Sequence, residues 1–154
     1  MASEVKPIPD GCEGATPYLC LNNASAAIEF YKKAFGATEV YRLAEPGGKI
    51  AHAEIRIGRA VIMLADEYPE LGHRSPISLG GTPVKIHLYV EDVDAVVSQA
   101  YDAGAKILKP VKDEFYGDRN GSFEDPFGHI WFIASRKENL TPEEIQERSA
   151  KLFG

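Results

Sequence analysis

Two histidines occupy positions at which imidazole could do acid–base chemistry. His52 is followed two residues later by Glu54, and His87 is followed two residues later by Tyr89. In an extended strand, residues two apart point to the same face. Neutral imidazole can accept a proton or bind a divalent metal. We therefore take His52, Glu54 and His87 as candidate catalytic residues, with a hydrogen-bonded place in the wall of a sheet as the alternative for each histidine.

Aromatic and charged side chains in the same segments could bind a small molecule. Tyrosines can stack on a planar ligand while offering a hydroxyl, and an arginine fork can hold a carboxylate or phosphate. The alternative for each such residue is a solvated position at the rim. The candidate ligand-binding residues are Tyr18, Arg56, Lys85, Tyr89, Tyr116, Arg119, Glu124 and Phe132.

Three helices are predicted to position these residues. Apolar residues recur at helical spacing over residues 24–35 and 93–103. Each stretch follows a residue that can cap its N-terminus and precedes a glycine that can end it. The run Thr141-Pro142-Glu143-Glu144 has the pattern of a capping box with proline in the first turn, so it predicts a C-terminal helix.

Alternating apolar and polar residues predict four strands around each of the first two helices. The two halves have the same order of elements, offset by 69 or 70 residues. This repeat predicts an α+β protein of two tandem βαβββ modules. The predicted strands span residues 16–21, 39–44, 50–57 and 60–65, and then 84–90, 106–111, 121–125 and 129–134.

The alternation also predicts which side chains share a face. In residues 84–90 the even positions are all aliphatic and should pack under a helix, which leaves Lys85, His87 and Tyr89 together on the other face. In residues 51–57 the same reasoning groups His52 with Glu54 and Arg56. If the sheets curve into a cup, these faces line a hollow with convergent polar groups, the usual form of a small-molecule site.

The chain is expected to divide into five segments. Residues 69–83 are polar and carry Pro, Gly and Ser throughout, which is typical of a linker. The predicted segments are a flexible N-terminus (1–8), a first module (9–68), the linker (69–83), a second module (84–138) and a C-terminal helix (139–154).

Composition excludes several classes of protein. The net charge of -6 argues against nucleic-acid binding, since phosphate contacts require a basic surface. No apolar stretch approaches the ~20 residues of a membrane span. The polar N-terminal residues lack the apolar core of a signal peptide. A cytoplasmic location, with partners that are neither nucleic acid nor membrane, is the expectation.

The sequence resembles the vicinal oxygen chelate superfamily, which includes glyoxalases, bleomycin-resistance proteins and dioxygenases. The resemblance rests on the repeated βαβββ order, on the helix segment Ile28–Gly36 and on the turn Glu124–His129. It is similar in particular to the PhnB-like branch. The motifs that favour this branch are Ala51–Glu54, Leu79–Pro83, His87–Val93 and Phe115–Arg119.

The resemblance implies where a metal would be bound. Metal-dependent members supply ligands from the first and last strands of each module, and the corresponding positions here are Thr16, Ile62, Lys85 and Phe132. None of these is a usual ligand for a divalent metal. We therefore expect no metal at the usual positions, while a displaced divalent-metal site that uses His52 or His87 is left open. The resemblance also implies a homodimer.

Three functions are consistent with these residues. The first is binding of a small organic molecule in the cup without changing it, as the resemblance to bleomycin-resistance proteins implies. The second is a metal-assisted isomerase or lyase that acts on a carbonyl compound through His52, Glu54 and His87. The third is a non-catalytic protein-interaction module with an acidic surface.

Overall fold

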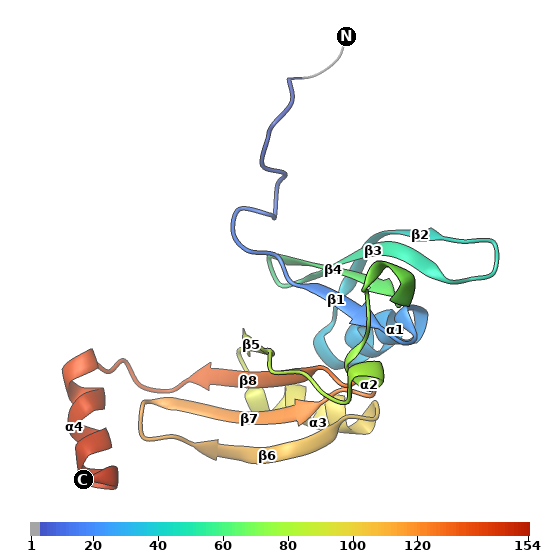
Figure 1. Cartoon of the computed structure of the whole chain (residues 1–154). Helices are drawn as coiled ribbons and strands as arrows, with labels where there is room; N and C mark the ends of the chain where they lie inside the picture. Colours follow the sequence, from blue (N-terminus) through green and yellow to red (C-terminus); the bar gives the residue numbers. More distant parts are fainter. Residues whose placement is uncertain (1–3) are drawn as a thin grey trace. The chain divides into compact units, whose positions relative to one another are not determined.

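The computed structural model describes residues 4–154. The chain divides into two compact units, one up to Leu79 (unit 1) and one from Gly80 onward (unit 2). Each unit contains a four-stranded mixed sheet and a helix that follows its first strand. Figure 1 shows these elements and the additional helix near the C-terminus. The predicted α+β class, with two βαβββ modules and a C-terminal helix, is confirmed.

The sheet of unit 1 has the strand order β1-β4-β3-β2. The outer pair β1 and β4 is parallel, and the other pairs are antiparallel. Helix α1 packs against β1, β3 and β4 and covers one face of this sheet. The elements are β1 (Tyr18–Leu21), α1 (Ala24–Phe35), β2 (Thr38–Ala44), β3 (Ile50–Ile57), β4 (Ala60–Asp66), the 3-10 turn η1 (Pro69–Leu71) and α2 (Pro76–Leu79).

The sheet of unit 2 repeats this arrangement with the order β5-β8-β7-β6. Here β5 and β8 are the parallel pair, and α3 covers one face by packing against β6, β7 and β8. The elements are β5 (Lys85–Tyr89), α3 (Val93–Asp102), β6 (Lys106–Asp113), β7 (Asp118–Glu124), β8 (Ile130–Arg136) and α4 (Pro142–Phe153).

Helix α1 forms where its sequence provides both ends and an apolar stripe. The Asn23 side chain accepts a hydrogen bond from the amide of Ala26, and Gly36 ends the helix in the left-handed region at φ 68°. Ala27, Ile28 and Tyr31 are fully buried against the sheet. The capping box predicted for α4 is also present, between Thr141 and Glu144.

A polar side chain at or next to the C-terminal end of β4 and of β8 accepts a hydrogen bond from the start of the helix in each unit. In unit 1, Asp66 accepts a hydrogen bond from the amide of Ala24 at 2.7 Å and a second from the amide of Ile50 at 2.7 Å. In unit 2, Ser135 Oγ accepts from the amide of Val93 at 3.1 Å. Asp66 and Ser135 are 69 residues apart, the same offset as the sequence repeat. The repeat therefore extends to the way each helix is anchored.

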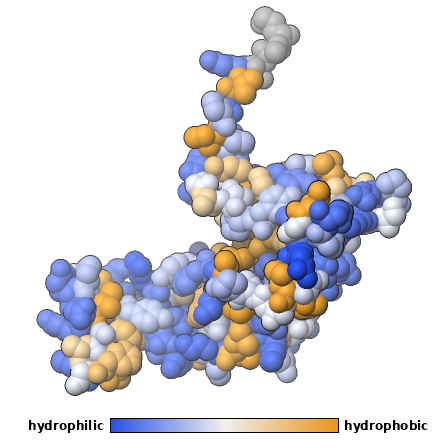
Figure 2. Space-filling model, viewed as in Figure 1, coloured by the Kyte–Doolittle hydropathy of each residue, from blue (hydrophilic) through white to orange (hydrophobic). Residues whose placement is uncertain are grey.

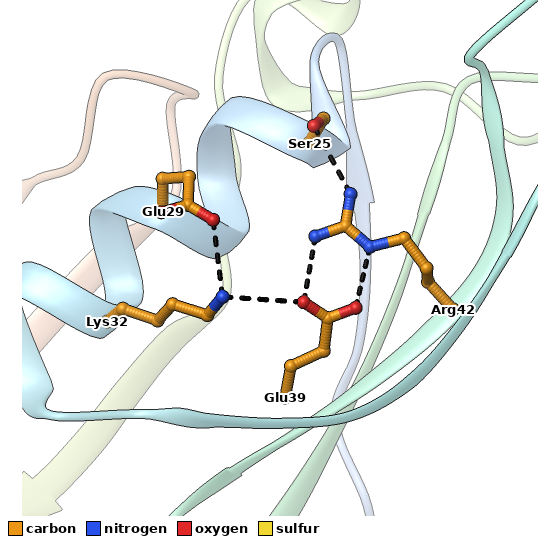
Figure 3. A network of polar contacts seen from close by, with 5 residues as sticks. All are labelled: Ser25, Glu29, Lys32, Glu39 and Arg42. Atoms are coloured by element: carbon orange, nitrogen blue, oxygen red, sulfur yellow. Dashed lines mark hydrogen bonds and ion pairs between the residues drawn. The ribbon is translucent and has the colours of Figure 1, made fainter.

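A network of ion pairs joins β2 to α1, as Figure 3 shows. Glu39 accepts two hydrogen bonds from the guanidinium of Arg42, at 2.6 Å and 2.8 Å, and pairs with Lys32 at 3.4 Å. Lys32 also pairs with Glu29, and Arg42 donates to Ser25 on the same helix. Hydrogen bonds from Arg42, together with the charge of Lys32, lower the pKa of Glu39 to about 2.

The depressed pKa of Glu39 predicts a pH-dependent contribution to stability. Unfolded Glu39 titrates near the usual ~4.3, so its contribution is complete above that pH and disappears as the pH falls toward about 2. Glu39→Gln should lower the free energy of unfolding by about 1 kcal/mol at pH 7, because partial exposure screens the pairs. Urea unfolding at pH 7 and at pH 3 measures this. The Glu29→Gln variant, which loses only the exposed pair with Lys32, is the matched control; equal losses in both variants would contradict the network.

Helix α4 contacts the rest of unit 2 through Arg148 and Phe153. The guanidinium of Arg148 pairs with Glu138 at 2.8 Å and donates to the carbonyl oxygen of Phe115 at 3.1 Å. The Phe115 ring also meets Phe153 edge-on. Apolar residues gather toward the C-terminal end of α4 (Figure 2), where Leu152 and Phe153 are exposed.

The structure differs from the sequence-based expectation at several boundaries. The first strand begins at Tyr18 rather than residue 16, and β7 begins at Asp118 rather than residue 121, because Asp118 continues the ladder opposite Arg136. The predicted linker 69–83 contains η1 and α2. Of the predicted flexible N-terminus, residues 1–3 lie outside the described residues, and residues 4–8 form no helix or strand.

Candidate functional site

The face of the unit 1 sheet opposite α1, here called open face 1, carries the predicted residues of β3. Ala53, Ile55 and Ile57 are buried on the helix side, so His52 and Glu54 project to open face 1. The register places Glu54 directly opposite Met63, and Met63 directly beside Tyr18. On the other side Glu54 is paired with Tyr41 of β2. Four strands therefore bring one row of side chains together.

Within this row the hydrogen bonds form a continuous chain. The hydroxyl of Tyr18 lies 2.6 Å from His52 Nδ1, and His52 Nε2 lies 2.9 Å from Glu54 Oε2. The hydroxyl of Tyr41 donates to the same Glu54 oxygen at 3.3 Å. The rings of Tyr18 and Tyr41 both contact the imidazole, with centroids 5.4 Å and 5.7 Å away. His52 and Glu54 therefore lie next to each other, and Tyr18 and Tyr41 extend their hydrogen bond into a chain of four side chains.

The surroundings of the two tyrosines raise the pKa values of both phenols. Burial, followed by the charges of Cys20 and Glu54, raises the pKa of Tyr18. Desolvation and the neighbouring Glu54 carboxylate raise the pKa of Tyr41. Both phenols therefore keep their protons at neutral pH. In the tautomer of His52 that carries its proton on Nε2, Tyr18 donates to Nδ1 and the ring N–H donates to Glu54.

A pocket of about 380 Å³ adjoins this chain, because Tyr18 also lines the pocket. Tyr68 closes one side: its hydroxyl donates to Glu45 at 2.5 Å, and Lys49 Nζ lies 3.9 Å from its ring centroid. The bond to Glu45 raises the pKa of Tyr68 to about 12. The pocket is lined by Tyr18, Glu45, Ala51, Ala65, Tyr68, Leu71 and His73.

The corresponding face of unit 2, open face 2, groups aromatic and cationic residues. Lys85, His87 and Tyr89 share this face with Phe132, which is directly opposite His87 in the register. The rings of His87 and Phe132 are nearly parallel at 6.4 Å, and His87 lies 4.8 Å from Tyr89. Tyr89 donates to Asp118 at 2.6 Å, which raises the pKa of the phenol. The predicted grouping of Lys85, His87 and Tyr89 on one face is therefore observed.

Arg119 and Ile62 lie on the helix-covered faces of their sheets. Arg119 lies on the face of its sheet covered by α3, where it pairs with Asp94 at 2.8 Å and with Asp113 at 3.1 Å. The guanidinium of Arg119 therefore forms ion pairs on the helix-covered face and does not project from open face 2. Ile62 is buried opposite Ile55 on the helix side, so Met63 is the residue of β4 that lies between Tyr18 and Glu54 on open face 1.

The remaining candidates lie apart from the Tyr18–His52–Glu54 chain. Arg56 is exposed at the far end of β3, with its guanidinium near Gly11. Thr16 precedes β1 and is partly buried. In unit 2, the hydroxyl of Tyr116 accepts from Asn120 at 2.6 Å, and Glu124 is partly buried opposite Ile130.

The donor set does not fit a divalent metal. Within residues 4–154 no group of three His, Cys, Asp or Glu side chains could hold an ion. Both ring nitrogens of His52 are engaged, one by Tyr18 and the other by Glu54. His87 has aromatic neighbours in Tyr89 and Phe132. The displaced metal site is therefore not assembled by the side chains described within either unit.

Sequence reasoning gave no role to most residues of this site, including Tyr41, Met63, Tyr68 and His73. Tyr41 and Met63 were given no role, although their register positions place them beside Glu54. Tyr68 was placed at the end of the first module and His73 in the linker, yet a bridge between them folds that segment back so that both line the pocket. Regular alternation in β2 could have suggested Tyr41, but bulges between Glu39 and Tyr41 and between Leu43 and Ala44 interrupt it.

No helix among residues 4–154 has the length and apolar character needed to cross a membrane.

The repeated sheets and their open faces define the class to which the chain belongs. Residues 16–133 match the Glyoxalase/Bleomycin resistance protein/Dioxygenase superfamily, so the chain is a member of that superfamily. The resemblance seen in the sequence is confirmed at this level.

Similar proteins extend from bacteria to plants. An uncharacterized protein of Mycobacterium bovis is 45% identical over 134 residues, which cover 85% of this chain and 88% of the relative. The X-ray structure of the Arabidopsis thaliana gene product At5g48480 is 27% identical, with a TM-score of 0.64 over 79% of this chain and 97% of that chain. The fosfomycin resistance protein FosX from Listeria monocytogenes, solved with Mn(II) and sulfate, is 18% identical, with a TM-score of 0.64 over 88% of this chain and 97% of that chain. FosX therefore shows the shared fold alone.

Proposed function

We propose that the protein binds a small organic molecule, with a planar or apolar portion, in the pocket on open face 1. The observation that carries this proposal is the position of Tyr18, which lines the pocket and also bonds to His52. A volume of about 380 Å³ is within the range of small-molecule sites.

The lining supports a mixed ligand. Ala51, Ala65 and Leu71 offer apolar contacts, and the rings of Tyr18 and Tyr68 offer planar surfaces. Tyr18, Glu45 and His73 are the residues of the lining that carry polar side-chain atoms besides Tyr68, and the His73 ring lies edge-on to Tyr18 at 5.5 Å. An uncharged or weakly charged aromatic compound with one or two oxygen atoms matches this lining.

A thermal-shift screen tests the proposal. A ligand that binds only the folded state raises the melting temperature with its concentration, so aromatic ketones and phenols at millimolar concentration should include stabilising compounds. Leu71→Asp places a charge in the lining at an exposed position. This substitution should raise the dissociation constant of a stabilising compound about tenfold or more, and a tenfold change corresponds to ~1.4 kcal/mol of binding free energy.

The control for this screen is Leu152→Asp, which changes an exposed leucine on α4 outside the pocket. This variant should bind as the unaltered protein does. The proposal fails if no compound stabilises the protein, or if Leu71→Asp and Leu152→Asp bind equally well.

Two narrower expectations accompany this function as predictions. Membership of the PhnB-like branch rests on the motifs quoted from the sequence. A homodimer is implied by the superfamily, and light scattering coupled to gel filtration distinguishes it from a monomer of 16.9 kDa.

A further inference from the structure

We propose that Glu54, His52 and Tyr18 form a proton relay, in which the Tyr18 hydroxyl takes a proton from a carbonyl compound bound in the pocket. This inference rests on the proposed function for the binding of that compound. It adds an acid–base reaction to that function. The three residues are joined by direct hydrogen bonds, so the proton transfer between them requires no metal ion.

The sequence carboxylate, imidazole, hydroxyl is an arrangement in which the imidazole can act as a base toward the hydroxyl. A carboxylate bonds to one ring nitrogen of an imidazole, and the other ring nitrogen faces a hydroxyl, at 2.9 Å and 2.6 Å respectively. In such an arrangement the imidazole receives the hydroxyl proton, and the carboxylate stabilises the imidazolium that forms. The side chains of His52 and Glu54 are only about one-fifth exposed, so the solvent screening of their interaction is reduced.

The position of Tyr18 connects the relay to the pocket. His52 and Glu54 do not line the pocket, whereas Tyr18 does. Any proton exchanged with a bound molecule along this chain therefore passes through the Tyr18 oxygen. Tyr41, which donates to Glu54 at 3.3 Å, is a positioning residue that holds the carboxylate toward His52.

The proposed step is balanced in atoms and charge. A C–H bond next to the carbonyl group of the ligand breaks, and its hydrogen forms a new O–H bond with Tyr18. The electron pair stays on the ligand as an enolate. The original Tyr18 proton moves to His52 Nδ1, and the resulting imidazolium pairs with the Glu54 carboxylate. Return of the proton to a different carbon gives an isomer, without an oxidant, a reductant or a second substrate.

Acetylation by p-nitrophenyl acetate tests whether His52 removes the Tyr18 proton. In this reaction the Tyr18 oxygen bonds to the acetyl carbon, p-nitrophenolate leaves, and the phenol proton passes to His52. Peptide mass spectrometry measures the rate of acetylation at each tyrosine. Base assistance should make Tyr18 react at least about tenfold faster at pH 7 than Tyr101, a tyrosine on α3 that is 63% exposed.

Variants separate base assistance from simple exposure. In His52→Gln the side chain at position 52 cannot take a proton, so the rate at Tyr18 should fall to that at Tyr101 or below. Glu54→Gln should give a smaller loss, because the imidazolium is no longer paired with a carboxylate. The rate at Tyr101 should not change in either variant. Equal rates at Tyr18 and Tyr101, or an undiminished Tyr18 rate in His52→Gln, would overturn the relay.

The same variants distinguish failure of the relay from failure of ligand binding. His52 does not line the pocket, so His52→Gln should keep the thermal shift produced by an apolar pocket ligand. Retained thermal shifts with no selective acetylation refute the relay and leave the binding function standing. Selective acetylation of Tyr18 without any stabilising ligand would refute the proposed binding of a small molecule in the pocket, while Tyr18 would still be activated by His52.

Discussion

Replacing Asp125 with alanine should lower the stability of unit 2 by about 4 kcal/mol, because two buried donors and one partly buried donor lose their acceptor. The carboxylate is 2% exposed. It accepts hydrogen bonds from the amide of Phe127 at 2.9 Å, the amide of His129 at 3.0 Å and Nε1 of Trp131 at 3.0 Å. Each buried donor left unpaired costs roughly 1–3 kcal/mol. Alanine offers no replacement acceptor, and burial limits access of water to these donors.

Urea unfolding followed by tryptophan fluorescence measures this loss directly in unit 2. The chain has one tryptophan, Trp131, which is 1% exposed. Asp125→Asn is the matched control, since the amide oxygen still accepts two of the bonds and the loss should be about half as large. A loss below about 1 kcal/mol for Asp125→Ala would show that the turn rearranges to satisfy these donors in another way.

The helices and the inward-facing residues could be predicted because they depend on local rules. Asn23 and Asp92 cap their helices through their own side chains. Alternation correctly separated Ile55 from Glu54 and Leu88 from His87, since a strand has only two faces. These properties require no knowledge of which strands are neighbours.

The error at Ile62 shows what local rules leave out. The position was counted from the Asp125-Pro126 turn and from the start of the helix, which puts it 70 residues before Phe132, but the turns of the two units differ in length. β3 and β4 are separated by Gly58 and Arg59, whereas β7 and β8 are separated by residues 125–129. The register pairs Leu19 with Leu64 and Leu88 with Ile133, which is an offset of 69 in both strands. A count that is wrong by one residue places a side chain on the opposite face.

The relay and the pocket depend on long-range pairing and were therefore only partly predictable. His52 and Glu54 are neighbours on one strand, so their contact follows from alternation. Tyr18 joins them from a strand 34 residues away, which no local pattern indicates. Arg119 was misplaced for the same reason, because its partner Asp94 lies 25 residues away on α3.

Replacing Asp66 with alanine should destabilise unit 1 by about 2–3 kcal/mol, since two backbone donors lose a charged acceptor. One is the amide of Ala24, at the start of α1, and the other is the amide of Ile50, at the start of β3. Asp66 thus joins the helix to the strand that carries His52. Asp66→Asn should lower the free energy of unfolding by about half as much, because the side-chain amide oxygen of asparagine can still accept one of the two hydrogen bonds.

Amide hydrogen exchange measures this loss where tryptophan fluorescence cannot, because Trp131 lies in unit 2. The amides of Ala24 and Ile50 should exchange about tenfold or more faster in Asp66→Ala, as each tenfold corresponds to ~1.4 kcal/mol. Ser135→Ala, which alters the equivalent residue of unit 2, should leave both amides unchanged. Loosening the start of β3 should also slow acetylation of Tyr18, since the bond to His52 depends on how this strand is held. Unchanged exchange at Ile50 in Asp66→Ala would show that β3 is held without Asp66 and would remove the structural link between helix anchoring and the relay.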